Sequence, residues 1–212
     1  MNRYFVAVAG NIGVGKSTLT GLLAQALGWE AFYEAVDDNP YLADFYRDMR
    51  AWSFHSQIFF LSRRLLHHHQ LSLRPNTVVQ DRSVYEDAEV FARNLYTQGL
   101  MAERDYASYR ELYDVICKLL PPPTLVVYLR ASTDTLLRRI ALRGRDFERT
   151  ITAAYLGQLN GLYDDWIAHF NLCPVLTVPA DRLDFVHNGD HTQLIVSKII
   201  EKLQGKDTVV FE

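Results

Sequence analysis

The sequence of 212 residues is poor in cysteine and has neither a long apolar run nor a strong excess of charge. Its two cysteines, Cys117 and Cys173, lie far apart without the spacing of a metal site, which indicates buried thiols in a reducing compartment. No apolar stretch is long enough to span a bilayer, and no signal peptide fits before the first predicted strand. The formal net charge of −3 argues against a broad basic surface for nucleic acid. We therefore expect a cytoplasmic protein that binds neither nucleic acid nor membranes.

Short apolar runs alternate along the chain with longer amphipathic stretches. This pattern favours an α/β fold with a five-stranded parallel sheet flanked by helices. The predicted strands are Tyr4–Ala9, Ala31–Tyr33, Thr77–Gln80, Thr124–Leu129 and Val175–Val178. The predicted helices are Thr18–Leu27, Tyr41–Leu73, Ser83–Leu119, Ser132–Leu142, Ala153–Phe170 and Thr192–Leu203. No repeat or linker interrupts the pattern, so we expect one domain over residues 1–212, with an arginine-rich lid at about 143–150.

A glycine-rich loop stands between the first predicted strand and the first predicted helix, as a phosphate-binding loop requires. Its residues are Gly10, Asn11, Ile12, Gly13, Val14, Gly15, Lys16, Ser17 and Thr18. The glycines let backbone N–H groups converge on phosphate oxygens, and the start of the helix adds its positive dipole end. We expect Lys16 to reach the β- and γ-phosphates and Ser17 to offer its hydroxyl to Mg²⁺. The loop therefore predicts a bound nucleoside triphosphate.

Two carboxylates stand at the ends of other predicted strands. Asp81 follows the third strand, where an aspartate associated with Mg²⁺ is expected, and the guanidinium of Arg82 is placed to bridge the phosphoryl group and an acceptor oxygen. An alternative is that Asp81 and Arg82 cap the next helix. Glu34 ends the second strand, where a carboxylate can take a proton from an attacking hydroxyl. The alternative for Glu34 is a solvated loop carboxylate.

Arginines are concentrated in one segment after the fourth predicted strand. They are Arg138, Arg139, Arg143, Arg145 and Arg149. Arg139 and Arg143 share a helix face at i, i+4, and Arg145 follows at the predicted turn. Arginines on a closing lid suit the charge of a phosphoryl group during transfer. The alternative is a solvated basic face, which we favour for Arg138 and Arg149.

Gln57 is a polar residue within a strongly aromatic helical stretch, residues 52–61. Its amide can form two hydrogen bonds to a nucleobase edge while aromatic rings stack beside the base. A glutamine at the edge of the core, bonded to backbone, is the alternative. The consecutive histidines His67–His69 point roughly 100° apart on a helix, so they do not predict a metal site.

These motifs together resemble the deoxyribonucleoside kinase family in content and order, from Tyr4 to about Phe185. The matching segments are the phosphate loop, Glu34-Ala35-Val36, Trp52-Ser53-Phe54, Asp81-Arg82-Ser83 and Arg139–Arg145. Ala35 stands where the family usually has proline, which leaves the backbone after Glu34 less fixed. Asp81, with the following Tyr85-Glu86-Asp87-Ala88, looks more like the bacterial deoxyadenosine and deoxyguanosine enzymes. The resemblance implies a P-loop kinase fold.

The resemblance also implies roles for the residues around ATP. Glu34 is implied as the general base for the 5′-hydroxyl, and Ser17 and Asp81 as the Mg²⁺ residues. The residues implied to stabilise the transferred phosphoryl group are Lys16, Arg82, Arg143 and Arg145. The phosphate loop and Arg139 are implied to bind ATP, with Asp184 and Phe185 in the adenine-binding loop.

A second set of matches implies the nucleoside pocket. Tyr46, six residues before Trp52, matches the tyrosine that contacts the sugar 3′-hydroxyl. Asp164 matches the second 3′-hydroxyl ligand, with the adjacent Asp165 as the alternative. The residues implied to line the base pocket are Gln57, Arg64 and Asp87.

We therefore expect an ATP-dependent enzyme that phosphorylates the 5′-hydroxyl of a purine deoxyribonucleoside, deoxyadenosine or deoxyguanosine, in nucleotide salvage. A deoxycytidine or broad-specificity kinase is the alternative. A nucleoside monophosphate kinase is more remote, because the Glu34 carboxylate has the wrong sign to grip an acceptor phosphate. A non-catalytic nucleotide-binding module is also more remote, and the Asn-Lys-x-Asp motif of a GTP switch is missing from the sequence. The resemblance implies a homodimer through the long helices and leaves room for a heterodimer.

Overall fold

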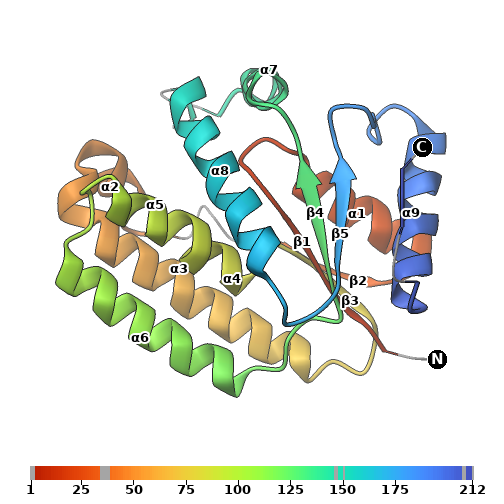
Figure 1. Ribbon diagram of the computed structural model, residues 1–212, viewed down its shortest axis with the longest axis horizontal. Coiled ribbons are helices and arrows are strands. Elements are labelled where there is room, and N and C mark those ends of the chain that lie inside the picture. The colour runs from red at the N-terminus through yellow and green to blue at the C-terminus, as the bar shows by residue number, and fades with distance from the viewer. Residues whose placement is uncertain (1–2, 34–38, 146–147, 150, 207–208, 212) are drawn as a thin grey trace.

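A parallel sheet of five strands forms the centre of the computed structural model, which describes residues 3–33, 39–145, 148–149, 151–206 and 209–211 (Figure 1). The strands are β1 (Phe5–Gly10), β2 (Glu30–Phe32), β3 (Val78–Asp81), β4 (Leu125–Arg130) and β5 (Val175–Pro179). Their order across the sheet is β2-β3-β1-β4-β5, and every neighbouring pair is parallel. The predicted α/β fold with a five-stranded parallel sheet is confirmed.

Strand β1 lies in the middle of the sheet and is buried on both faces. Successive side chains of a strand point to opposite faces. Accordingly, Val6 and Val8 pack into one hydrophobic core, while Ala7 and Ala9 pack into another. This burial on both faces explains why β1 is a continuous apolar run in the sequence.

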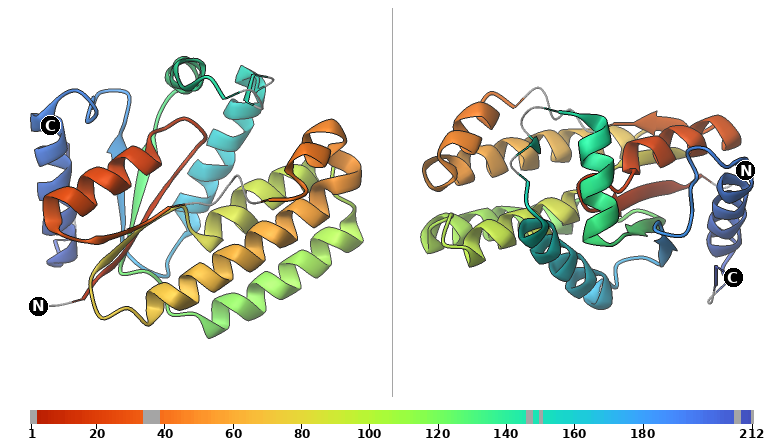
Figure 2. Two further views of the ribbon diagram at one scale, coloured as in Figure 1. Left: turned by 180° about the vertical axis from the view of Figure 1, so that it is seen from behind. Right: turned by 90° about the horizontal axis from the view of Figure 1, so that it is seen from above.

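Helices cover both faces of the sheet. They are α1 (Lys16–Leu27), α2 (Leu42–Arg47), α3 (Met49–Ser72), α4 (Val84–Glu86), the π-helix η1 (Asp87–Ala92), α5 (Arg93–Thr97), α6 (Glu103–Leu119), α7 (Thr133–Arg143), α8 (Ala153–His169) and α9 (Gly189–Leu203). Figure 2 shows α1 and α9 together at one end of the molecule and α3 and α6 at the other. None of the described helices is both long and apolar enough to cross a membrane.

Two long helices predicted from the sequence are each divided in the structure. The predicted helix Tyr41–Leu73 is interrupted at Asp48, whose side chain caps α3 by accepting a hydrogen bond from the Ala51 N–H. The predicted helix Ser83–Leu119 is interrupted before α6, where Gly99 adopts a left-handed φ of +69°. An aspartate N-cap begins a new helix and a left-handed glycine ends one, and neither changes the apolar periodicity on which the prediction rested.

The carboxyl ends of β1 and β3 meet at one edge of the sheet. Val8 pairs with Asp81, so the loop after Gly10 begins beside the segment that carries Asp81 and Arg82. Helix α7 covers this loop, since a Cβ at Gly13 would lie 2.7 Å from the Ile140 side chain. Ligands of open α/β sheets bind at such carboxyl edges, so the topology places the site here.

Candidate active site

A pocket at the carboxyl edge brings together many of the residues singled out in the sequence. The predicted site residues that line it are Ile12, Gly13, Lys16, Ser17, Tyr46, Gln57, Asp81, Arg82, Asp87, Arg143 and Arg145. Glu34 and the rest of segment 34–38 lie outside the described residues. The pocket joins the loop after β1, the helices α2 and α3, the segment after β3, and the region beyond α7.

The loop after β1 is held in shape by its own side chains. Lys16 Nζ donates to the carbonyl oxygens of Gly10 and Asn11, at 2.9 and 3.2 Å. The Asn11 amide donates to the Leu156 carbonyl at 3.0 Å and to Asn160 Oδ1 at 2.8 Å, which ties the loop to α8. The loop is therefore pre-formed, as a phosphate-binding loop must be if its backbone N–H groups are to converge on an anion.

Glycine is required in this loop for both conformation and space. Gly10, Gly13 and Gly15 have φ angles of +143°, +80° and +104°, which residues with side chains rarely adopt. A Cβ at Gly10 would lie 2.5 Å from the Leu129 carbonyl oxygen. After the loop, Ser17 and Thr18 occupy exposed positions in the first turn of α1.

Ser17 and Asp81 bring a hydroxyl and a carboxylate together beside the loop. Ser17 Oγ donates to Asp81 Oδ2 at 2.5 Å, and Asp81 is only 3% exposed. Asp81 Oδ1 is buried and has no hydrogen-bond partner among the described residues. An unpaired buried carboxylate oxygen beside a hydroxyl fits Mg²⁺, which prefers hard oxygen ligands. The described part of the chain has no cluster of three His, Cys, Asp or Glu for a metal, but Mg²⁺ usually completes its shell with water and phosphate.

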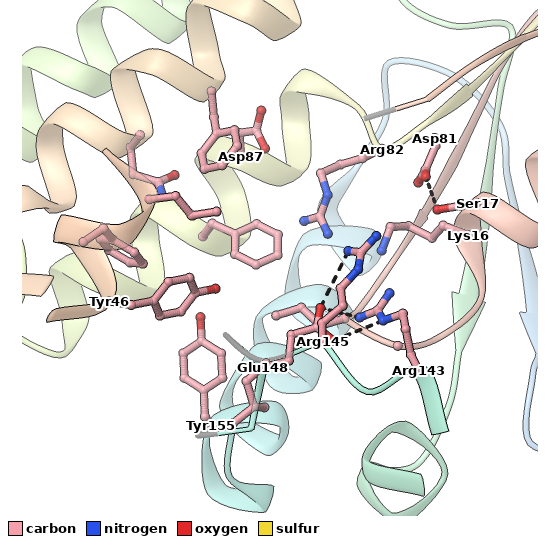
Figure 3. A pocket seen from close by; sticks show the side chains of 18 of the residues that line it. Lys16, Ser17, Tyr46, Asp81, Arg82, Asp87, Arg143, Arg145, Glu148 and Tyr155 are labelled. Atoms are coloured by element: carbon pink, nitrogen blue, oxygen red, sulfur yellow. Dashed lines mark hydrogen bonds and ion pairs between the residues drawn. The ribbon is translucent and has the colours of Figure 1, made fainter. Parts of the chain in front are cut away.

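Four cationic side chains approach one another at the loop end of the pocket: Figure 3 shows Lys16, Arg82, Arg143 and Arg145 pointing into the same space. Arg82 has a φ of +67°, the one positive φ of a non-glycine residue in the described ranges. Its guanidinium also lies 4.4 Å from the centroid of the Phe91 ring. A strained backbone at such a convergence is typical of functional sites, and the charges predict an anionic ligand.

Glu148 is a pocket residue that the sequence analysis missed. It is 5% exposed and accepts hydrogen bonds from Arg143 Nη2 at 2.5 Å and Arg143 Nε at 3.1 Å. Arg145 Nη1 lies 3.9 Å from the same carboxylate (Figure 3). The sequence contained one signal for Glu148: it is an acidic residue within an arginine-rich segment, three residues after Arg145.

Two tyrosines face one another beside Glu148. Figure 3 shows the hydroxyls of Tyr46 and Tyr155 on the same side of the pocket. Burial raises the pKa of Tyr155 to about 12, and the neighbouring Tyr46 adds to this effect. Tyr155 therefore keeps its proton at neutral pH and can donate a hydrogen bond.

Asp164 does not line this pocket, contrary to the expectation that it lies with Tyr46. Its carboxylate accepts from Arg130 Nε at 2.9 Å and Nη2 at 2.8 Å. The alternative, Asp165, is also elsewhere and pairs with Arg93 at 2.6 Å. Asp164 follows Tyr155 by nine residues, or about two and a half helical turns, so it lies on the opposite face of α8. The sequence match did not take account of this helical phase.

The far end of the pocket combines aromatic rings with a buried ion pair. Gln57, only 5% exposed, projects from α3 into this end. Arg64 does not line the pocket but holds Asp87, which does: Arg64 Nε donates to Asp87 Oδ2 at 2.9 Å. The aromatic lining residues are Phe45, Phe60 and Phe91. An amide, a fixed carboxylate and flat apolar surfaces suit a nucleobase.

The other residues predicted to bind ATP, which are Arg139, Asp184 and Phe185, do not line this pocket and lie on the other side of the phosphate loop. Arg139 donates to the carbonyl oxygens of Val14 and Ala180, at 2.8 and 2.9 Å. Phe185 is buried, and a Cβ at Gly15 would lie 3.0 Å from its ring. Asp184 is exposed and accepts from the His187 N–H at 3.2 Å. Arg139 and Phe185 thus support the loop, while Asp184 stabilises a nearby turn.

Comparison with protein-family models identifies this architecture. The family model described as deoxynucleoside kinase matches residues 6–204. The chain belongs to the deoxynucleoside kinase family. It is accordingly an ATP-dependent phosphotransferase with a P-loop kinase fold, and the resemblance found in the sequence is confirmed.

Curated relatives cover nearly the whole chain. A deoxyadenosine/deoxycytidine kinase of Bacillus subtilis is 39% identical over 196 residues, covering 92% of this chain and 90% of the relative. A deoxyadenosine kinase of Lactobacillus acidophilus is 36% identical, covering 94% of this chain and 96% of the relative. Deoxyadenosine kinase from M. mycoides, solved with bound dATP, superimposes with a TM-score of 0.81 at 30% identity, covering 93% of this chain and 100% of that one.

The buried Arg64–Asp87 pair of this kinase predicts a large stability effect. In the variant Asp87→Ala the Arg64 charge stays buried without its carboxylate, so we expect the free energy of unfolding to fall by about 3 kcal/mol or more. Chemical denaturation measures this change. The control is Asp44→Ala, which removes the exposed Arg47–Asp44 pair and should cost less than about 1 kcal/mol. Equal losses in the two variants would contradict the prediction.

Proposed function

We propose that this deoxynucleoside kinase phosphorylates the 5′-hydroxyl of deoxyadenosine, with deoxycytidine as a second substrate, in nucleotide salvage. The observation that carries the proposal is the polarity of the pocket: four cations lie at the loop end, and Gln57 with Asp87 lies at the other. A deoxynucleoside bound between these two ends would direct its 5′-carbon toward the phosphate loop and its base toward the Gln57 amide.

The base preference follows from hydrogen-bond patterns. Adenine and cytosine each present a ring nitrogen acceptor beside an amino donor, and one amide orientation at Gln57 satisfies both. Guanine presents the reverse pattern on the same edge, so it would require the amide to be turned over. The proposed pair of substrates agrees with the similarity to the Bacillus subtilis relative, a deoxyadenosine/deoxycytidine kinase.

Positioning and electrostatics supply most of the proposed catalysis. Lys16, Arg82, Arg143 and Arg145 would stabilise the oxygens of the γ-phosphoryl group, as their convergence supports. Glu34 would take the proton of the 5′-hydroxyl, a role that rests on the sequence motif alone. Mg²⁺ would supply further charge stabilisation at the phosphates.

Ser17 and Asp81 are the residues proposed to hold Mg²⁺, supported by the unpaired Asp81 Oδ1. We also propose that residues 1–212 form one domain and that segment 143–150 acts as a lid over the phosphates. The expected cytoplasmic location remains a prediction.

Glu148 replaces Asp164 in the proposed contact with the sugar 3′-hydroxyl. It is buried in the pocket that Tyr46 and Tyr155 also line, and its carboxylate lies beside Arg143 and Arg145 (Figure 3). The bidentate hydrogen bonds from Arg143 fix its orientation. Because Arg143 is also proposed to contact the phosphoryl group, this pair would couple sugar binding to the catalytic arginine.

Initial rates with the four deoxynucleosides, at equal concentration and fixed ATP, test the proposed substrates. We expect kcat/KM to be highest for deoxyadenosine, followed by deoxycytidine. Deoxyadenosine monophosphate serves as the control acceptor and should give no turnover, because its 5′-phosphate leaves no free 5′-hydroxyl and would be repelled by the proposed base Glu34. Faster turnover of a monophosphate would contradict the proposal and favour a monophosphate kinase. ATP binding without acceptor-dependent ATP loss would favour a non-catalytic module.

The role of Glu148 is tested by acceptors that lack the 3′-hydroxyl. Wild-type enzyme should prefer deoxyadenosine over 2′,3′-dideoxyadenosine by about 10-fold or more in kcat/KM, because the dideoxy compound lacks the 3′-hydroxyl that would donate to the Glu148 carboxylate. Glu148→Gln should lose most of this preference. Asp164→Asn is the matched comparison and should retain it. Loss of the preference in Asp164→Asn alone would restore the assignment made from the sequence.

We propose a homodimer as the assembly, with α3 and α6 at the interface. These helices pack together and expose apolar side chains, which are Leu66, Leu73, Leu112, Val115 and Leu119. Such surfaces commonly mark protein interfaces.

Sedimentation measures the assembly directly. We expect wild-type protein to sediment as a dimer and Val115→Glu to sediment as a monomer, since the introduced charge would be buried without a partner at the interface. Leu172→Glu, at another exposed apolar position, is the control and should leave the dimer intact. A monomeric wild type would contradict this proposal.

A further inference from the structure

Glu86 is a fully buried carboxylate beneath the phosphate end of the pocket, with no exposed surface. Its Oε1 accepts from the Gly10 N–H at 3.1 Å and from the Tyr163 hydroxyl at 2.8 Å. Its Oε2 accepts from the Ser83 N–H at 2.8 Å and from the Ser83 hydroxyl at 3.3 Å. Both carboxylate oxygens are therefore saturated by donors, as a buried carboxylate requires.

The donors come from three separate segments, each of which carries part of the site. Gly10 ends β1 and begins the phosphate loop. Ser83 directly follows Arg82 and caps α4. Tyr163 belongs to α8, the helix that also contributes Tyr155 to the pocket. One side chain thus holds the phosphate loop, the catalytic arginine segment and a pocket helix together.

The charge of Glu86 is balanced by residues of the site. Burial raises the pKa of its carboxyl, while Arg82, Lys16 and the hydrogen bonds from Ser83 and Gly10 act in the opposite direction. Burial is the largest of these effects, so the net pKa of Glu86 is raised, and the two cations with the hydrogen bonds oppose this shift.

Arg82 has a backbone that needs external support. Its φ of +67° is unfavourable for a residue with a side chain, and such strain persists only where surrounding contacts hold it. The Arg82 N–H donates to Val8 at 3.0 Å, and the next N–H, that of Ser83, donates to Glu86. Two adjacent hydrogen bonds therefore fix the strained peptide on both sides of Arg82.

We infer that Glu86 is a positioning residue for phosphoryl transfer: by binding the Gly10 and Ser83 backbone with one carboxylate, it sets Arg82 at a fixed place beside the phosphate loop. This inference rests on the proposed role of Arg82. A misplacement of about 1 Å in a catalytic group costs on the order of 100-fold in rate. Glu86 therefore affects the transfer step although it does not touch a substrate.

The variant Glu86→Gln tests the inference with almost no change in shape. Its amide nitrogen would face the donors of Gly10, Tyr163 or Ser83, so at least one segment must move. We expect kcat per folded enzyme to fall by about 30-fold or more, with KM for deoxyadenosine within about 3-fold of wild type. A purely structural role would reduce the folded fraction but not the kcat of the folded enzyme. A kcat for Glu86→Gln within about 2-fold of the wild-type value would overturn the inference.

Tyr163→Phe provides a milder test that does not depend on the folding of Glu86→Gln. It removes one donor to Glu86 Oε1 and keeps the ring in the core. We expect Tyr163→Phe to lower kcat by about 5-fold in the wild-type enzyme. Added to Glu86→Gln, it should lower kcat no further than Glu86→Gln alone. Tyr113→Phe, at another buried tyrosine, is the control and should retain wild-type kcat. Equal kcat values for Tyr163→Phe and Tyr113→Phe would overturn the inference.

Arg82→Lys separates failure of the inference from failure of the proposed role of Arg82. If Arg82→Lys lowers kcat while Glu86→Gln and Tyr163→Phe do not, Arg82 keeps its role and only the positioning by Glu86 is refuted. If Arg82→Lys retains wild-type kcat, both the role of Arg82 and the inference are refuted. If all three substitutions lower kcat with little change in KM, the positioning role is supported.

Discussion

The mutual repulsion of four cations is the constraint on which the rest of this site depends. Lys16, Arg82, Arg143 and Arg145 converge in one pocket, and their charges must be balanced before any phosphate binds. Carboxylates and carbonyls provide this balance: Glu148 accepts from Arg143, and loop carbonyls accept from Lys16. The cations are thus held in place in advance, so little reorganisation is needed when charge develops on a phosphoryl group.

Sheet topology brings these groups together from distant parts of the sequence. Because all five strands are parallel, their carboxyl ends share one edge, and the central position of β1 places its loop between the segments after β3 and β4. Helix α8 then closes the site from the other side through Asn11 and Glu86. The buried contacts of α8 explain how a helix late in the chain can shape a loop that forms near its start.

Local sequence patterns predicted the sheet and the phosphate loop, whereas pocket residues such as Tyr46 and Asp87 were predicted from the family resemblance. Strand burial appears as apolar runs, and the loop requires glycine and lysine at set positions. Asp164 was misplaced because a spacing match does not reveal which face of α8 the residue occupies. Glu86 was overlooked because its partners Gly10 and Tyr163 are distant in sequence. Glu148 was overlooked because the sequence does not show that its carboxylate is buried in the pocket with Arg143.

The sequence by itself determined the kind of chemistry: the phosphate loop predicted a bound nucleoside triphosphate, and the Glu34 motif with the family resemblance predicted phosphoryl transfer to a hydroxyl. Only the tertiary structure decided which carboxylates line the pocket and which lie outside it. The physical reason is that a carboxylate's role depends on its burial and on the donors around it. Glu148 in the pocket, Glu86 beneath it and Asp164, which contacts Arg130 of β4, are all acids, and their packing alone distinguishes them.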